Sequence, residues 1–480
     1  MSCVYRTALA MLLAGPAAAM AQAPSTPASS ANPSDPVPTT TLPDVVVSAT
    51  REGEDRVQVP SSITRIDRPE IEFIRPGHPS EILNLVPGVV VQQTNGEGAL
   101  VGIRQPVSTA PVYLYLQDNV PVQAAGFFNH NALYLLNIPQ AASMEVIRGP
   151  GTALQGSDAI GGVINVLMPA SSPVPMVAGS LEVGSFGWVR GLGTASTTVG
   201  NYGFRGDFNI THSDGWRTQT AYDRQALNLR FDWQVSGDTR VVSTINFGNI
   251  YQQTGANSTV SAYDWVHNPT RNNYPIAYRQ VQSLMATTMW ERSYGDALVT
   301  ITPYMRSNRM ELLPSFTLRN DPSRYVSEYN SLGALLRYRQ DFEPWRTRVI
   351  TGIDMEYSPG SFNEVRIVPT TVNGIMTSYR RTIQLYDYNV AFAQSSPYLH
   401  LETSPLPDLR ITAGLRFDAL GYIYENNLPT GAFASGLTGA SATFYRPGNT
   451  NPFYHRFNPN LGFTYTLSLI HISEPTRPER

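Results

Sequence analysis

Residues 227–235 have the sequence LNLRFDWQV, and this stretch decides the class of fold. Its odd positions are apolar and its even positions are polar. A period of two puts the apolar side chains on one face of a β-strand and the polar ones on the other. The polar face carries both charge signs, with Arg230 next to Asp232, while the apolar face includes Phe231 and Trp233. Such a strand suits lipid on one side and a wet lumen on the other.

The same alternation recurs at residues 349–357 and 409–418. Between residues 175 and 466 we count about twelve alternating segments, separated by Gly, Asn, Asp and Pro. Longer polar loops are expected at residues 252–275, 359–386 and 425–453. A soluble β-sandwich also alternates, but it seldom has strands of ten or more residues with Tyr and Trp near their ends. The predicted fold class of this region is therefore a transmembrane β-barrel.

Residues 52–170 have a different sequence pattern, which predicts a compact α/β domain. A short helix is expected at residues 80–88, and strands at 89–91, 112–116, 144–148 and 159–166. Gly96-Glu97-Gly98 follows a strand, as a dinucleotide-binding loop does. It lacks the third glycine and the later acidic residue of that fingerprint, so we do not predict a nucleotide site.

The amino terminus has the features of an export signal. Arg6 precedes an apolar run at residues 8–19, and Ala21-Gln22-Ala23 fits a cleavage site, so residues 1–23 are predicted to be a signal peptide. Residues 24–43 are rich in Pro, Ser and Thr and are expected to be a disordered linker. No later stretch offers 18 consecutive apolar residues, which excludes a membrane-spanning helix.

The linker ends in a β-branched run at residues 44–50, DVVVSAT. A strand-forming segment at the end of a disordered arm is suited to pairing with the sheet edge of another protein. The alternative is that this run is the first strand of the domain that follows.

Composition excludes several classes of function. The net charge of −3 attracts no nucleic acid, and charged residues are only 15% of the chain. The single cysteine, Cys3, lies in the predicted signal peptide, and the seven histidines have no metal-ligand spacing. We find no catalytic constellation, so we expect no enzyme activity, no metal site and no cofactor.

Taken together, these segments resemble a TonB-dependent outer-membrane receptor of the siderophore-receptor kind. The resemblance covers residues 42–466 and rests on LPDVVVSATR (42–51), SEILNLVPGVVV (80–91), VYLYLQDNVPV (112–122) and MEVIRGPGTALQGSDAIGGVINV (144–166). It implies an N-terminal plug domain inside a 22-stranded barrel in the outer membrane of a Gram-negative cell. It also implies import of a scarce ligand, energised by TonB and its inner-membrane complex.

The resemblance assigns roles to particular residues. The TonB box is residues 44–51, and TonB would bind Asp44, Val45, Val46, Val47, Ser48, Ala49 and Thr50. Arg104 and Arg148 would pair with glutamates on late barrel strands. Phe127, Phe128 and His130 of a plug loop, with Arg104, would contact the ligand. The family's Asp-Gly turn is here Asp118-Asn119, and Asn tolerates the positive φ that the turn needs. Gln105 departs from the family's glycine.

Alternatives remain for the identity of the ligand and for the interpretation of the carboxyl-terminal residues. A ferric siderophore is the expected cargo. Cobalamin is an alternative, and so is haem, because Asn458-Pro459-Asn460-Leu461 resembles a motif of haem receptors. Residues 467–480 resemble a translated sequencing adapter, so we expect a partial barrel of about twelve strands that stops near Thr466. A truncated, non-functional fragment is thus a further alternative.

Overall fold

The computed structural model describes residues 45–466, apart from residues 109, 126–131, 256–258 and 435–442. The chain divides into residues 1–43 and 44–480, so every described residue belongs to the second unit. The predicted signal peptide and linker, Asp44 and the tail at 467–480 lie outside the described residues. Among the described residues, no helix is long and apolar enough to cross a membrane.

The first domain contains a five-stranded mixed sheet in the order β3-β8-β9-β6-β7. Its strands are β3 (Ile63–Asp67), β6 (Tyr113–Gln117), β7 (Val120–Pro121), β8 (Ser143–Arg148) and β9 (Gly162–Leu167). Beside it lie the hairpin of β4 (Val89–Asn95) and β5 (Gly98–Ile103), the helices α1 (Arg68–Ile74) and α2 (Pro79–Leu83), and the 3₁₀ turns η1 (Arg56–Gln58), η2 (Leu133–Leu135) and η3 (Ile138–Gln140). The predicted α/β character of this region is confirmed.

The predicted helix at residues 80–88 forms, but it ends earlier than expected. The Asn84 side chain accepts from the Val91 amide at 2.6 Å and donates to the Val91 carbonyl at 3.2 Å. These bonds turn the chain from α2 into β4, so the backbone leaves the helix before Pro87-Gly88. The Asp118-Asn119 turn has the predicted backbone, with φ of 49° and 66°.

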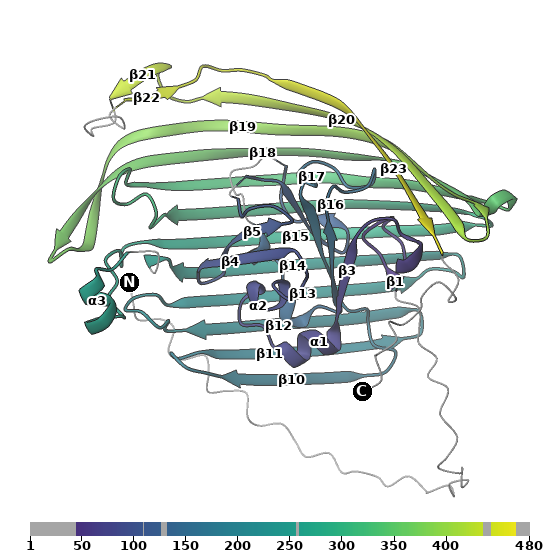
Figure 1. Cartoon of the computed structure of the whole chain (residues 1–480), viewed down its shortest axis with the longest axis horizontal. Helices are drawn as coiled ribbons and strands as arrows, with labels where there is room; N and C mark the ends of the chain where they lie inside the picture. Colours follow the sequence, from purple (N-terminus) through teal and green to yellow (C-terminus); the bar gives the residue numbers. More distant parts are fainter. Residues whose placement is uncertain (1–44, 109, 126–131, 256–258, 435–442, 467–480) are drawn as a thin grey trace, which may run out of the picture. The chain divides into compact units, whose positions relative to one another are not determined.

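The second domain is one antiparallel sheet of twelve strands that follow each other in chain order, which confirms the predicted count (Figure 1). The strands are β10 (Met176–Val183), β11 (Val189–Val199), β12 (Tyr202–Ser213), β13 (Tyr222–Gln234), β14 (Thr239–Gln253), β15 (Tyr278–Tyr294), β16 (Ala297–Leu313), β17 (Ser323–Phe342), β18 (Thr347–Val372), β19 (Ile375–Leu406), β20 (Leu409–Asn426) and β23 (Phe453–Tyr465). Within the described residues, β10 and β23 form the two edges of this sheet.

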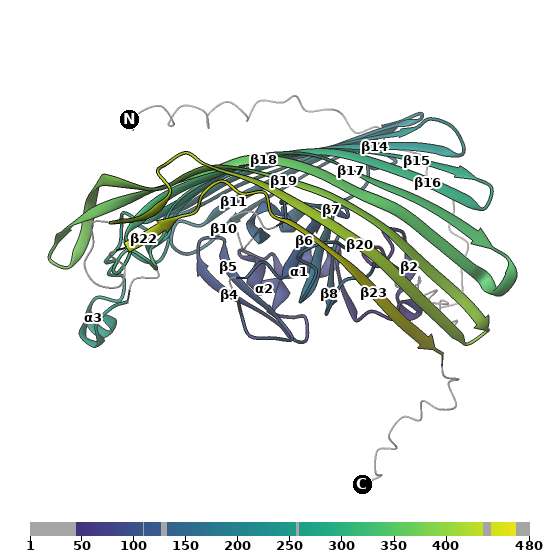
Figure 2. The ribbon, with the colours of Figure 1, turned by 90° about the horizontal axis from the view of Figure 1, so that it is seen from above.

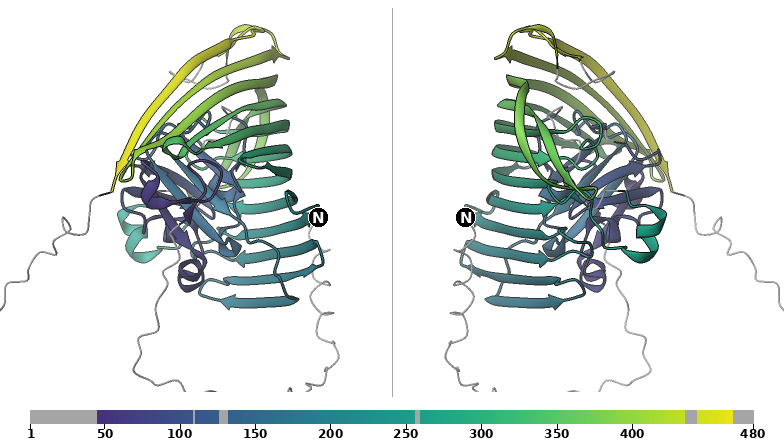
Figure 3. Two further views of the ribbon diagram at one scale, coloured as in Figure 1. Left: turned by 90° about the vertical axis from the view of Figure 1, so that its right-hand side faces the viewer. Right: turned by 90° about the vertical axis from the view of Figure 1, so that its left-hand side faces the viewer.

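The sheet curves around the first domain, which lies against its concave face (Figures 2 and 3). Concave-face side chains such as Asn246, Arg306 and Asp354 bond to residues of the first domain. Their outward neighbours in sequence include Ile245, Met305 and Met355, which are exposed. The two faces therefore have the polar-inside, apolar-outside arrangement that the alternation predicts.

One expected loop is wrong. Residues 359–386 do not form a loop, because β18 and β19 continue through most of them as a long hairpin whose turn is Asn373-Gly374. The polar residues there are paired in register from Arg348↔Glu402 to Val372↔Ile375, with bulges at three points. Because polar side chains occur on both faces of this hairpin, the alternation of apolar and polar residues that predicts a strand is absent there. The other two expected loops are interrupted by α3 (Ala262–His267) and by the hairpin of β21 (Gly431–Ala434) and β22 (Thr443–Arg446).

The main hydrophobic core lies inside the first domain and extends to the wall. It contains Leu83, Val91, Tyr115 and Val146, among others, together with Met285, Tyr304 and Leu335 of the large sheet. The two domains therefore share packing, and the first is held in place by apolar contacts as well as by the polar ones described below.

Candidate functional site

The predicted TonB-binding segment is buried against the first domain. Val45–Val46 (β1) pairs with Glu54–Asp55 (β2) in an antiparallel ladder of two residue pairs. Val46 and Ser48 have no exposed surface, and Ala49 and Thr50 are only 2% exposed. The run therefore pairs within its own chain, as the alternative in the sequence analysis expected. An outside partner could add to this strand only after it had left its place.

One carboxylate of the first domain receives the segment. Glu145 on β8, itself completely buried, accepts from the amide of Val47 at 2.9 Å, the amide of Ser48 at 2.7 Å and the Ser48 hydroxyl at 2.6 Å. Asn165 on β9 donates to the same hydroxyl at 3.0 Å. Hydrogen bonds to a charged acceptor are stronger than neutral ones, so Glu145 is the principal polar attachment of residues 47–48.

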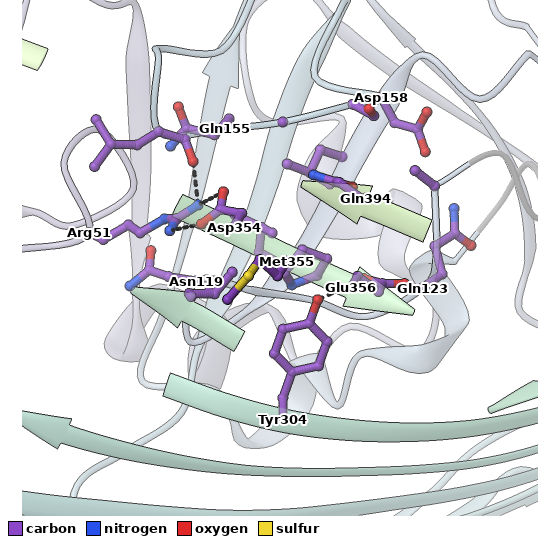
Figure 4. Close-up of a pocket in the computed structure, with 18 of the residues that line it drawn as sticks. Arg51, Asn119, Gln123, Gln155, Asp158, Tyr304, Asp354, Met355, Glu356 and Gln394 are labelled. Carbon is purple, nitrogen blue, oxygen red and sulfur yellow. Dashed lines mark hydrogen bonds and ion pairs between the residues drawn. The ribbon is translucent and has the colours of Figure 1, made fainter. Parts of the chain in front are cut away.

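The end of the segment is attached to the barrel wall by Arg51 (Figure 4). Its guanidinium makes a bidentate pair with Asp354 of β18, at 2.8 and 2.9 Å, and Arg416 of β20 donates to the same carboxylate at 2.8 Å. The side chains of Arg51, Asp354 and Arg416 are 12%, 8% and 2% exposed. They border a cavity of about 40 Å³, room for two or three waters, which also reaches Gln394.

Two acidic residues continue this attachment along the wall. Glu52 pairs with Arg337 at 2.9 Å and also with Arg339, both on β17. Glu54 contacts Arg348 of β18 at 3.3 Å, and it lies beside Glu402 of β19. Burial raises the pKa of Glu54, and the adjacent Glu402 carboxylate raises that pKa further. Residues 45–54 are therefore bonded both to the first domain and to β17–β20.

The predicted plug-to-barrel arginines have their described contacts inside the first domain. Arg104 donates to the Arg148 carbonyl at 3.1 Å and to the Ser62 hydroxyl at 2.9 Å. Arg148 donates to the Pro87 carbonyl at 2.9 Å. Their pairing with barrel glutamates stays a prediction. Phe127, Phe128 and His130, predicted to contact ligand, lie outside the described residues, and Arg104 is exposed.

The structure also brings together residues that sequence reasoning did not select. Glu97, at the tip of the β4–β5 hairpin, pairs with Arg224 and Tyr222 of β13, and its amide donates to Gln252 at 3.0 Å. The positive φ of Gly96, 49°, lets this tip turn against the wall. In the sequence, Gly96-Glu97-Gly98 resembles only an incomplete nucleotide-binding loop. The acidic residue between two glycines is the sequence feature that could have indicated a contact between this hairpin tip and the large sheet.

A cationic and aromatic surface lines the concave face toward the end with the longer loops. Tyr325, Phe362, Tyr388 and Tyr424 form a chain of rings with centroids 5.4, 5.3 and 4.8 Å apart. The Arg279 guanidinium lies 5.5 Å from the centre of the Tyr134 ring. Its Nε and Nη1 atoms are buried and have no hydrogen-bond partner in the part of the chain that the structure describes. We call Arg279 and these four rings the aryl surface.

The residues described contain no group of three or more His, Cys, Asp or Glu side chains that could hold a metal ion. The candidate site has two parts: the aryl surface, and the hydrogen bonds and ion pairs that attach residues 45–54 to the first domain and to the large sheet.

Comparison with known proteins identifies the first domain. Residues 55–163 match the model of the TonB-dependent receptor plug domain. This part of the chain belongs to the plug-domain family. The chain is also similar to the vitamin B12 transporter BtuB of Vibrio vulnificus (strain CMCP6), with 35% identity over 144 residues, which are 29% of this chain and 23% of that protein.

Solved structures share the fold of this chain. The ferripyoverdine receptor of the outer membrane of Pseudomonas aeruginosa superposes with a TM-score of 0.70 at 14% identity, covering 88% of this chain and 57% of that one. The unliganded ferric citrate transporter FecA gives a TM-score of 0.69 at 16% identity, covering 86% and 62%. The chain thus spans less than two thirds of each of these relatives. Its first domain matches the plug domain, and its large sheet has the fold of their barrels.

Proposed function

We propose that this protein is a receptor that imports a scarce ligand, a ferric siderophore, across the outer membrane with energy delivered by TonB. The observation that carries this proposal is the double attachment of residues 45–54. One short segment that includes the predicted TonB box is bonded both to the plug, through Glu145, and to the wall, through Asp354. Force applied to that segment acts directly on the contacts that keep the plug in place.

The mechanism follows from the chemistry of this connection. The outer membrane has no energy source of its own, so the work arrives mechanically. TonB would pair with residues 44–50 as an added β-strand, whose backbone hydrogen bonds share a load along the chain. That pairing requires β1 to leave β2 and Ser48 to leave Glu145. Further pulling would then separate Arg51 from Asp354 and open a path beside the plug.

The aryl surface supports the siderophore as ligand. A ferric chelate with aryl groups and net negative charge would stack on Phe362 and Tyr388, and the positive charge of Arg279 would attract it to this surface. The solved relatives that transport ferripyoverdine and ferric citrate support the same class of cargo. Cobalamin is the second candidate, because the curated relative is a vitamin B12 transporter.

Uptake assays in a strain that lacks the receptor gene test the proposal. When the receptor is restored, this strain should accumulate radioactive iron from an aryl siderophore, and the same strain without TonB should not. Arg279→Gln should weaken binding of the chelate. Arg240→Gln is the matched control, since this β14 residue is 49% exposed and pairs with Glu291 far from the aryl surface. Uptake of labelled cobalamin without uptake of any iron chelate would select the second candidate.

Coupling is tested separately. Val46→Pro removes a backbone donor from the strand that TonB would extend, so it should abolish uptake and leave ligand binding intact. Val46→Ala keeps the donor and should retain most uptake. Equal uptake by the two variants would contradict the assignment of residues 44–50.

A further inference from the structure

Two carboxyl groups meet where residues 45–54 end against the large sheet. Glu54 of β2 is 8% exposed and Glu402 of β19 is 2% exposed. Both accept from one nitrogen, Nη2 of Arg410 on β20, which lies 2.6 Å from Glu402. Two buried carboxylates that depend on one shared donor repel each other strongly when both are charged. The geometry therefore favours a proton on one of the two.

The second arginine beside this pair is engaged mainly elsewhere. Arg348 of β18 donates from Nε to Asp341 at 2.8 Å, whereas its Nη1 lies 3.3 Å from Glu54 and 3.7 Å from Glu402. The other charged groups of this network are paired with one another or with Asp341: Glu52, Arg337 and Arg339. Arg348 thus compensates the charge of the facing pair only in part.

His400 of β19 is the remaining titratable group of the cluster, and its bonding indicates where the proton lies. Its Nε2 is 3.1 Å from Glu402, so the neutral ring donates Nε2–H to that carboxyl group. Its Nδ1 is buried and has no hydrogen-bond partner within the described part of the chain. A second proton on the ring would be a buried donor without an acceptor, which is costly. The additional proton therefore belongs between Glu54 and Glu402.

The cluster lies where protons from the periplasm can reach it. Glu402 and Arg410 flank the short turn between β19 and β20, whose last ladder pair is Leu406↔Leu409. Short turns face the periplasm in such barrels. The side chains of Arg410 and Arg348 are 18% and 26% exposed, so the buried carboxyl groups have solvated neighbours.

We propose that a proton shared between Glu54 and Glu402 holds residues 52–54 to the large sheet, and that this attachment loosens as the pH rises. While the proton is present, a hydrogen bond joins the two carboxyl groups. When the proton is lost to water, two carboxylates face each other, and Glu54 gains hydration by leaving. Glu54 follows Arg51 and Glu52 in the chain, so a pull from the amino-terminal side reaches this attachment last.

The titration of Glu54 supports this direction. Burial, followed by the Glu402 carboxylate, raises the pKa of Glu54 from 4.5 to about 7 against the opposing effect of Arg410. A released Glu54 returns to its ordinary value, so the attached state binds the proton more tightly. The attachment is therefore strongest below about pH 4.5 and weakens as the pH rises to about 7.

The consequence for transport rests on the proposed function. Ferric iron hydrolyses and precipitates more completely as the pH rises. An importer of ferric chelates with this proton-linked attachment would open most easily under the conditions in which soluble iron is scarcest.

Hydrogen exchange of the full chain, followed by mass spectrometry of peptides that cover residues 45–55, tests this inference. Each variant is compared with the wild type at the same pH, so the intrinsic pH dependence of exchange cancels. Glu54→Gln keeps a neutral, hydrogen-bonding side chain at every pH. The ratio of the wild-type rate to the Glu54→Gln rate should therefore rise about tenfold between about pH 5.5 and 7.5. A rise of less than about threefold would overturn the proposal.

Glu402→Gln removes the same pair from the other side and keeps the test available if Glu54→Gln does not fold. The ratio of the wild-type rate to its rate should also rise at least about threefold over this range, and a constant ratio would overturn the shared proton. Glu72→Gln is the matched control, because this α1 side chain is 57% exposed and pairs with Arg68 of the same helix. Its ratio should stay constant.

The measurement needs neither TonB nor a transported ligand. Its failure would leave the proposed import untouched, and failure of the uptake assays would leave this proton-linked attachment standing.

Discussion

Replacing Asp354 by Asn should release residues 45–51 from the barrel wall. The substitution keeps the shape of the side chain but removes the charge that accepts from Arg51 at 2.8 and 2.9 Å and from Arg416 at 2.8 Å. Two guanidinium groups are then left close together in a buried place without their counter-ion. Breaking a buried ion pair costs about 3–5 kcal/mol. Because the asparagine can still accept one hydrogen bond, we expect a cost of about 3 kcal/mol.

Because about 1.4 kcal/mol corresponds to a factor of ten, the released population should rise roughly 100-fold. Ala49 is 2% exposed, so a cysteine introduced there reacts with a water-soluble maleimide only when the segment is released. The labelling rate reports that population when opening is fast and reversible. The background is low after Cys3→Ser, because Cys3 is the chain's single cysteine.

Asp67→Asn is the control for this experiment. Asp67 also pairs with an arginine, Arg65, at 2.6 Å, but its side chain is 57% exposed. Exposed pairs contribute about 0–1 kcal/mol, so labelling should change little. If Asp354→Asn keeps its secondary structure and labels less than threefold faster than the wild type, the buried carboxylate does not hold the segment and the reasoning is refuted.

Three further changes test other parts of the structure. Glu145→Gln removes the charged acceptor of the Ser48 amide and hydroxyl, and hydrogen bonds to a charged group contribute about 1.5–3 kcal/mol. The labelling rate at position 49 should therefore rise about tenfold or more. An unchanged rate would contradict this assignment. Burial raises the pKa of Asp118 to about 6, so its stabilising effect is complete below the unfolded value near 3.8 and is lost as the pH rises through about 6. Asp118→Asn should therefore raise the denaturation midpoint at pH 7.5 and have little effect at pH 4, and an equal effect at both pH values would argue against a buried charge. Gly96→Ala puts a methyl group 2.5 Å from the Gln252 side chain at a φ of 49°, so it should lower the free energy of unfolding by about 1–2 kcal/mol. A free energy of unfolding within error of the wild type would show that the hairpin tip rearranges without cost.

The sequence by itself determined the two-domain organisation and the twelve strands. The alternation in residues 227–235 is local: it depends on which side chains face lipid and which face water, and both environments leave a pattern within one strand. The Asp118-Asn119 turn could also be predicted, because positive φ is a property of individual residues.

Only the tertiary structure decided the candidate site. Arg51 and Asp354 are 303 residues apart, and Glu145 is 97 residues from Ser48. These contacts therefore cannot be predicted from the spacing of residues in the sequence. The long β18–β19 hairpin was missed for a related reason: its outer part is polar on both faces, and register with its neighbours, rather than burial on one face, makes it a strand. Local patterns report the solvent that each side chain meets, whereas ion pairs and strand register depend on which distant segments the fold brings together.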